Sequence, residues 1–390
     1  MDRVGHIVRR RAVFFVPGFD PAPPRALRER YRREAAKQAR LSGHVIQISA
    51  DGSHAWRVDA VIEGQECETR IEVLAWSDLV RAEMRGGGVW RSFANLTRAA
   101  MTYVRAGAIA PLFSLRKGPV IAISYPVLVV LTELLVAALL VVAGAQFGPI
   151  GALVGGVAGY AALSLAARKD PIFAHYLIDD YAYAAREDGA YPPALEARLA
   201  AFQAKLAAAC LADYDEVLLI GHSSGAYLAV SLMADLRRAG GAHPALSLMT
   251  LGHVVPMVSF LPRATRLRGD LAALSTDQAL TWVDISAPAD GCCFALCDPV
   301  AVSGVAPDNQ SWPLVIAAAF SQTLTPATWA ALRWRLFETH FQYLNAFDGG
   351  GDYDYFALTA GGQSLAARYS GRTPSPSRIT RAVSPHRGVT

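Results

Sequence analysis

The sequence has little charge for its size. Only 18% of its 390 residues are charged, whereas about 25% is usual for a soluble domain, and 53% are hydrophobic. Either part of the chain lies in lipid, or something covers an unusually apolar surface. The net charge is only +4, and no recognised nucleic-acid-binding motif accompanies the basic residues, so we expect no nucleic acid partner.

Cysteines are few, odd in number and unevenly spaced. Three of the five lie close together, which is not typical of a disulfide framework and favours reduced thiols in the cytoplasm. These three, Cys292, Cys293 and Cys297, lack paired ligands at a recognisable zinc spacing. We therefore predict no metal site and no cofactor, and the role of the three thiols stays open.

Two long stretches have almost no charge. Residues 119–145 contain a single charged side chain, and residues 147–167 contain none. Each stretch is long enough to cross a bilayer, which takes about 20 apolar residues in a helix. Only a tight reversal separates them. We therefore predict a two-helix transmembrane hairpin at residues 116–169.

Basic residues flank both ends of this hairpin. Arg116 and Lys117 precede the first span, and Arg168 and Lys169 follow the second. Because positive charge stays on the cytoplasmic side, both ends should lie in the cytoplasm. We expect a multi-pass protein of the cell inner membrane with two spans, and with its catalytic domain and both termini cytoplasmic.

Three glycines repeat in the second span. Gly151, Gly155 and Gly159 recur every four residues, which places them on one helix face. Such a face permits close approach of another helix. Contact with a second copy of the chain through these glycines is one interpretation, and an oligomer is therefore possible in principle.

Two regions are rich in arginine. Residues 25–40 read as a basic helix, and residues 370–390 combine arginine with serine, proline and threonine. Membrane lipids with anionic headgroups would suit both, and a solvated helix face and a disordered tail explain them equally well. We predict that residues 370–390 form a disordered basic tail.

Strand and helix patterns alternate outside the hairpin. Apolar runs at 12–19, 216–220, 246–251 and 279–286 read as strands, with helical patterns between the later ones. This rhythm predicts an α/β fold with a mostly parallel sheet flanked by helices, interrupted by the transmembrane hairpin.

One motif carries chemistry. Residues 221–225 read Gly-His-Ser-Ser-Gly, directly after the strand at 216–220 and directly before an Ala-rich helix. A serine on such a sharp strand-turn-helix bend needs glycine neighbours, because β-carbons would collide with the adjoining elements. The bend presents the Ser223 hydroxyl at the carboxyl edge of the sheet, beside backbone N–H groups that stabilise an oxyanion.

With this elbow, Gly221 and Gly225 flanking Ser223, the sequence resembles the α/β-hydrolase superfamily. The resemblance implies a serine hydrolase with residues 1–115 as the first part of its domain, including a strand-rich segment, and residues 170–369 as the second part with the triad. It also implies that the backbone amides of Phe19 and Ser224 form the oxyanion hole.

The family's chain order places the acid and then the histidine after the nucleophile. The histidines in that region are His243, His253, His340 and His386. We favour His340 because it follows an acid-bearing loop, whereas His243 and His253 come early and His386 lies in the predicted tail.

Three aspartates compete for the role of the acid. Asp284 lies inside the strand at 279–286, and Asp290 lies in the loop at the carboxyl end of that strand, where the family carries its acid. We favour Asp290, with Asp298 as the alternative.

Together these features predict a membrane-anchored serine hydrolase that cleaves or transfers an acyl group of an ester or thioester through a Ser223 acyl-enzyme. The substrate would be an acyl-lipid or a small ester, because an anchored enzyme gains local concentration of lipids. The alternative is a catalytically inactive hydrolase fold that serves as a membrane scaffold or binds a partner.

Overall fold

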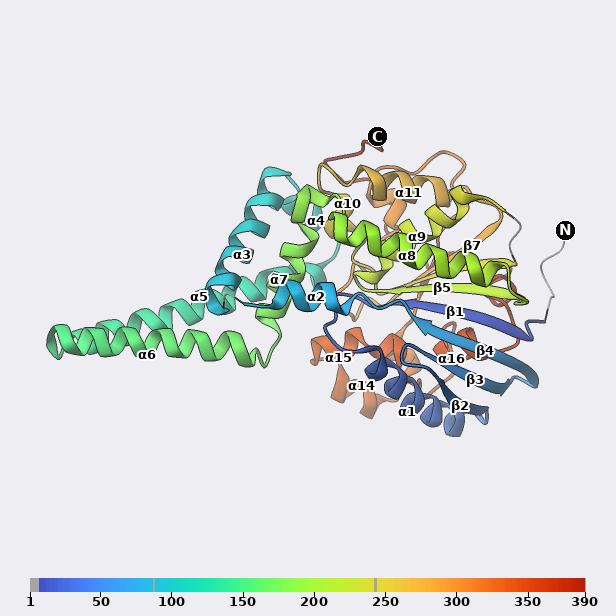
Figure 1. The fold of residues 1–390 in the computed structure, drawn as a ribbon, viewed down its shortest axis with the longest axis horizontal. Helices are drawn as coiled ribbons and strands as arrows, with labels where there is room; N and C mark the ends of the chain where they lie inside the picture. Colours follow the sequence, from blue (N-terminus) through green and yellow to red (C-terminus); the bar gives the residue numbers. More distant parts are fainter. Residues whose placement is uncertain (1–6, 87, 242–243, 390) are drawn as a thin grey trace.

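A computed structural model of the chain describes residues 7–86, 88–241 and 244–389. Its centre is an eight-stranded sheet in the order β2-β3-β4-β1-β5-β6-β7-β8, with helices against both faces (Figure 1). The strands are β1 (Arg10–Val16), β2 (Val45–Asp51), β3 (Ala55–Ile62), β4 (Gln65–Val73), β5 (Glu216–His222), β6 (Ala245–Leu251), β7 (Leu280–Ser286) and β8 (Leu314–Ala317).

The sheet is mixed, which corrects the prediction of a mostly parallel sheet. Strands β2, β3 and β4 pair antiparallel, whereas the ladders from β4 through β1 to β8 are parallel. The reason is the short connection between β3 and β4, the residues Glu63 and Gly64, both with positive φ. Such a two-residue turn joins only antiparallel neighbours.

The other regular elements of the described chain are helices. They are α1 (Pro24–Ser42), α2 (Ser77–Met84), α3 (Gly88–Arg105), α4 (Ile109–Phe113), α5 (Lys117–Ala145), α6 (Gly148–Lys169), α7 (Ala174–Ala184), α8 (Pro193–Cys210), α9 (Gly225–Ala239), α10 (Val255–Ser259), α11 (Thr265–Ser275), α12 (Pro299–Val302), α13 (Phe320–Thr323), α14 (Pro326–Leu332), α15 (Leu336–His340), α16 (Tyr355–Ala360) and α17 (Leu365–Arg368), with 3-10 helices η1 (Arg186–Gly189) and η2 (Gln342–Leu344).

Strand β5 shows why the central strands are apolar throughout. Val217 and Leu219 pack into the core under α8, α9 and α11, while Leu218 and Ile220 pack into the core on the opposite face. Successive side chains of a strand point to opposite faces, so a strand covered on both sides must be apolar at every position. The last two residues of β5, Gly221 and His222, are the first two of the Gly-His-Ser-Ser-Gly motif.

Helices α5 and α6 form an antiparallel hairpin that projects from the domain (Figure 1). Both are long and apolar enough to cross a membrane, and few of their residues are buried within the chain. Leu139, Ile150 and Val157 are 57%, 79% and 64% exposed. An apolar surface of this extent is unusual on a soluble monomer.

The three repeated glycines of α6 face α5 of the same hairpin. A β-carbon on Gly155 would lie 2.3 Å from the carbonyl oxygen of Leu140, and one on Gly159 would lie 3.1 Å from the carbonyl oxygen of Ala137. The close helix approach that the spacing predicts is therefore made inside the chain.

The C-terminal segment packs on the domain. The amide of Ile379 donates to the carbonyl of Leu296, and the amide of Val383 donates to the carbonyl of Val302. The prediction of a disordered tail is therefore wrong for residues 370–389. Composition argued for disorder, but these backbone groups find partners on the loop after β7, which composition does not reveal.

We expect Gly155→Leu to destabilise the protein in detergent micelles by roughly 1–3 kcal/mol relative to Gly156→Leu, because overpacking a close contact costs about that much. Gly156 is the matched control, since its added β-carbon meets nothing within 4 Å. Thermal unfolding of both variants measures the difference. Equal stability of the two would contradict the hairpin packing.

Candidate active site

Ser223 occupies a strained turn between β5 and α9. Its backbone φ is +57°, a left-handed value that residues other than glycine rarely adopt. Strain of this kind costs about 1–3 kcal/mol and persists only where the surroundings hold it. Here the Ser223 amide donates to the carbonyl of Leu251 at the end of β6, at 3.0 Å. The sequence-predicted bend is therefore present.

Glycines make this turn possible by letting backbones touch. A β-carbon on Gly221 would lie 2.5 Å from the carbonyl oxygen of Gly225, and one on Gly225 would lie 2.1 Å from that of Val16. Gly18, on the loop after β1, would place a β-carbon 3.0 Å from the Ser223 β-carbon. The distances at Gly221 and Gly225 are too short for a side chain, and one at Gly18 would crowd Ser223, so the elbow and the β1 loop are closely packed.

The two amides predicted for the oxyanion hole lie on either side of this contact. Phe19 follows Gly18, and Ser224 immediately precedes α9. Within the described residues neither amide donates a hydrogen bond. The Tyr176 hydroxyl donates to the Phe19 carbonyl and so fixes that peptide. Two free amides beside a serine hydroxyl, one at a helix N-terminus, suit a developing negative charge.

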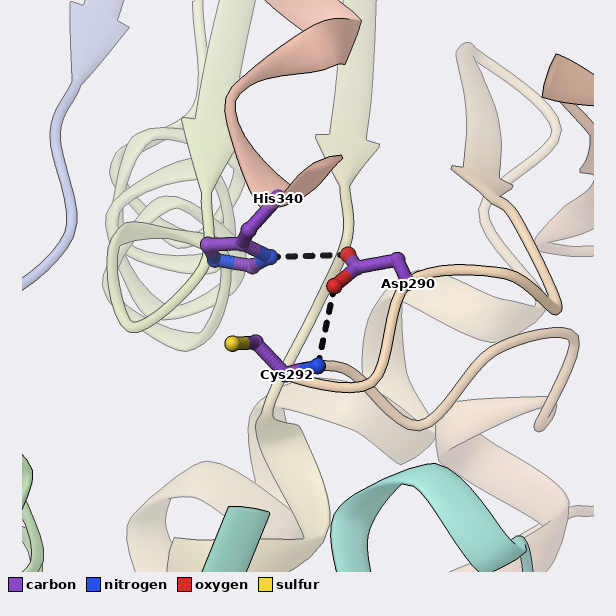
Figure 2. A group of neighbouring side chains, drawn as sticks. All are labelled: Asp290, Cys292 and His340. Atoms are coloured by element: carbon purple, nitrogen blue, oxygen red, sulfur yellow. Dashed lines mark hydrogen bonds and ion pairs between the residues drawn. The ribbon is translucent and has the colours of Figure 1, made fainter. Parts of the chain in front are cut away.

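His340 and Asp290 form a hydrogen-bonded pair (Figure 2). His340 Nδ1 donates to Asp290 Oδ2 at 2.7 Å, and both side chains are buried. The other ring nitrogen, Nε2, is buried without a hydrogen-bond partner. His340 and Ser223 line the same pocket. The three residues favoured from sequence are thus brought together, although no hydrogen bond joins Ser223 to His340 in the described chain.

Asp290 is held in its charged form. Burial alone would raise its pKa, but the charge of His340 and its hydrogen bond hold the pKa below the ordinary value, with help from the Cys292 amide. That amide donates to Oδ1 at 2.9 Å, and the Tyr343 hydroxyl donates to Oδ2 at 3.0 Å. A fixed carboxylate can orient the imidazole and stabilise the imidazolium that forms when His340 takes a proton.

His222, the residue before Ser223, contacts His340 directly. Its Nε2 donates to the carbonyl of His340 at 3.0 Å, and the two rings lie 4.6 Å apart. Burial, followed by the charge of His340, lowers the pKa of His222 to about 3, so the ring is neutral. His222 therefore helps to position His340.

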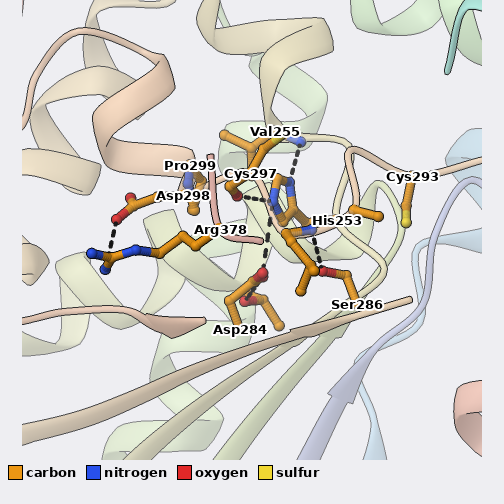
Figure 3. A network of polar contacts seen from close by, with 12 residues as sticks. His253, Val255, Asp284, Ser286, Cys293, Cys297, Asp298, Pro299 and Arg378 are labelled. Atoms are coloured by element: carbon orange, nitrogen blue, oxygen red, sulfur yellow. Dashed lines mark hydrogen bonds and ion pairs between the residues drawn. The ribbon is translucent and has the colours of Figure 1, made fainter. Parts of the chain in front are cut away.

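The alternative acid and base candidates belong to a separate network (Figure 3). His253 donates from Nε2 to the carbonyl of Cys297 at 2.8 Å, with Asp284 Oδ2 at 3.8 Å. Asp298 caps α12 by accepting from the amides of Val300 and Ala301. Neither His253 nor Asp298 lines the pocket with Ser223. They hold the loop that carries Asp290.

Of the remaining histidine candidates the structure describes only His386, which does not line the pocket with Ser223. His386 donates from Nε2 to the carbonyl of Ala106 at 3.0 Å, at the end of α3. His243 lies outside the described residues.

Asp290, Cys292 and His340 also form a group that could in principle hold a metal ion. Two ligands of one tetrahedral zinc stand about 3.3 Å apart, given metal–ligand distances near 2.0 Å. The 2.7 Å between His340 Nδ1 and Asp290 Oδ2 is instead a hydrogen-bond distance. Burial raises the pKa of the Cys292 thiol well above its ordinary value, which disfavours the thiolate that binds metals.

Asp180 of α7 is a pocket residue that sequence reasoning missed. It lines the pocket with Ser223 and accepts a hydrogen bond from the Ser224 hydroxyl at 3.1 Å. Burial raises its pKa to about 7, only partly opposed by Ser224 and His340. No local motif marks it. The one signal was an Asp-Asp pair within an otherwise apolar and aromatic segment after the hairpin.

We expect Asp180→Asn to gain stability relative to the wild type as the pH rises. An unfolded aspartate ionises near pH 4, whereas folded Asp180 ionises at about 7. The free energy of unfolding of the wild type therefore falls as the pH rises from about 4 to about 7. Above pH 7 the loss caused by Asp180 stays constant. Thermal unfolding at pH 4.5 and pH 8.5 measures this, with exposed Asp308→Asn as the control. A pH-independent difference would show that Asp180 is ionised throughout.

Comparison of the chain with known protein families, curated proteins and solved structures finds no match. Any function must therefore be argued from the arrangement of side chains and backbone groups around Ser223.

Proposed function

We propose that this protein is a membrane-anchored serine hydrolase of the α/β-hydrolase type, with Ser223 as nucleophile, His340 as base and Asp290 as the acid that orients it. The observation that carries the proposal is the strained Ser223 turn, next to two amides that donate no hydrogen bond within the described residues, with His340, paired to Asp290, lining the same pocket. This combination supports acyl transfer as the chemistry of the site.

The reaction would proceed in two halves. Ser223 Oγ attacks the carbonyl carbon of an ester or thioester while His340 Nε2 takes the Oγ proton, and the amides of Phe19 and Ser224 stabilise the oxyanion. The carbon–oxygen or carbon–sulfur bond then breaks, and His340 gives its proton to the leaving alcohol or thiol. Water, deprotonated by His340, attacks the acyl-enzyme and releases the carboxylic acid and free Ser223.

The hairpin of α5 and α6 supports a lipid-like substrate. Its exposed apolar surface would be favourable in a bilayer and costly in water. An anchored enzyme meets acyl lipids at high local concentration and in a fixed orientation. The basic residues at both ends of the hairpin support an inner-membrane location with the catalytic domain in the cytoplasm.

A membrane scaffold without catalysis is the second candidate. The observation that favours it is the missing hydrogen bond between Ser223 and His340 Nε2. Catalytic hydrogen bonds are often long before substrate binds, so this observation weighs less than the assembled pocket. Chemical labelling separates the two candidates.

A fluorophosphonate probe should label the purified protein covalently, and Ser223→Ala should abolish the labelling. The reason is that only a serine hydroxyl activated by a neighbouring base attacks phosphorus at a useful rate. Ser53→Ala, which removes an exposed hydroxyl in the turn between the edge strand β2 and β3, is the matched control and should label like the wild type. Unlabelled wild-type protein would support the scaffold.

Asp290→Asn should lower kcat/KM for an ester by about 10⁴, the loss that follows when the histidine is no longer held in the correct tautomer. Asp298→Ala should instead cost about 1 kcal/mol of stability, because it removes the N-cap of α12, and should leave kcat/KM within about twofold. Steady-state kinetics and thermal unfolding of both variants measure these effects. The reverse pattern would make Asp298 the acid.

A further inference from the structure

The membrane hairpin contributes directly to the active-site pocket. Pro119, Ala122 and Ile123, from the first two turns of α5, line the same pocket as Ser223 and His340. Ala122 is only 3% exposed, and its carbonyl accepts a hydrogen bond from the Tyr181 hydroxyl at 2.9 Å. The start of α5 is thus a fixed wall of the pocket as well as the root of the anchor.

The same part of α5 rests on the loop that carries the catalytic acid. A β-carbon on Gly118 would lie 2.9 Å from the Cα of Gly291, the residue after Asp290. Just before the helix, Arg116 Nε donates to the carbonyl of Ala295 at 2.8 Å. These contacts fix the start of α5 relative to the His340–Asp290 pair.

From this wall α5 continues outward as an exposed apolar surface. Leu128, Leu131 and Leu135 are 62%, 56% and 59% exposed. On another side of the pocket, Phe337 packs on Phe173, just beyond the end of α6, with ring centroids 4.5 Å apart. The apolar lining of the pocket is therefore next to the base of the hairpin, where a bilayer would begin.

We propose that the first two turns of α5 form the subsite for the acyl chain, and that the chain reaches Ser223 along α5 from the bilayer. The substrate class is then a long-chain acyl ester or thioester resident in the membrane. This inference rests on the proposed function, because it assigns a substrate to the same Ser223 site.

The physical reason is continuity of an apolar environment. Each methylene exposed to water costs about 0.8 kcal/mol. A chain that leaves the bilayer along α5 avoids most of that exposure, since one apolar surface replaces another. A pocket that opened only to water would not offer this path.

The test alters the pocket wall and measures preference for chain length. Wild type, Ala122→Phe and Ile123→Ala are assayed in nanodiscs with p-nitrophenyl esters from acetyl to palmitoyl. Ala122→Phe fills the subsite and should lower the palmitoyl-to-acetyl ratio of kcat/KM by about tenfold, equivalent to about 1.4 kcal/mol. Ile123→Ala enlarges the subsite and should shift the preference toward longer or bulkier chains.

Ala138→Phe, on the exposed part of α5, is the matched control and should keep the wild-type ratio. Equal losses for all chain lengths in Ala122→Phe, or an unchanged ratio in both pocket variants, would overturn the inference. Labelling by a short-chain fluorophosphonate shows that each variant retains an assembled site. Absence of labelling and of ester turnover in the wild type would instead overturn the proposed function.

Discussion

The site depends on how closely the turn at Ser223 packs against the end of β1. A left-handed serine fits between this strand and helix because Gly221 and Gly225 bring backbones within distances that no β-carbon permits, and because Gly18 leaves room beside Ser223. That packing places the Ser223 hydroxyl beside the amides of Phe19 and Ser224. A side chain added at Gly221 or Gly225 would push these backbones apart, so the proposed oxyanion hole depends on this packing.

The loop after β7 is the second half of the site, and it is held from several directions. His253 donates a hydrogen bond to the carbonyl of Cys297 in this loop, and the Ser286 hydroxyl accepts one from the amide of Leu296. Helix α5 contacts the loop at Gly291. Asp290 is therefore positioned partly by a buried polar network and partly by the membrane hairpin. The base of the apolar hairpin and the Asp290 loop therefore belong to one packed unit.

The sequence predicted the parts of the site that obey local rules. The turn around Ser223 requires glycines at fixed spacing, and the choice of Asp290 and His340 follows the chain order of acid and then histidine that the resemblance implies. Asp180 and the start of α5 were not predicted, because their place in the pocket depends on how segments distant in the chain pack together. The antiparallel pairs of β2 to β4 and the ordered segment after residue 370 were missed for a similar reason, since backbone partners decide both.

The most direct test of the central claim is an experimental structure of the protein in nanodiscs after reaction with a phosphonate inhibitor. The account predicts phosphorus bonded to Ser223 Oγ, with the phosphoryl oxygen accepting from the amides of Phe19 and Ser224 and with His340 Nε2 close to the Ser223 oxygen. An adduct on another residue, or a phosphoryl oxygen directed away from both amides, would contradict it.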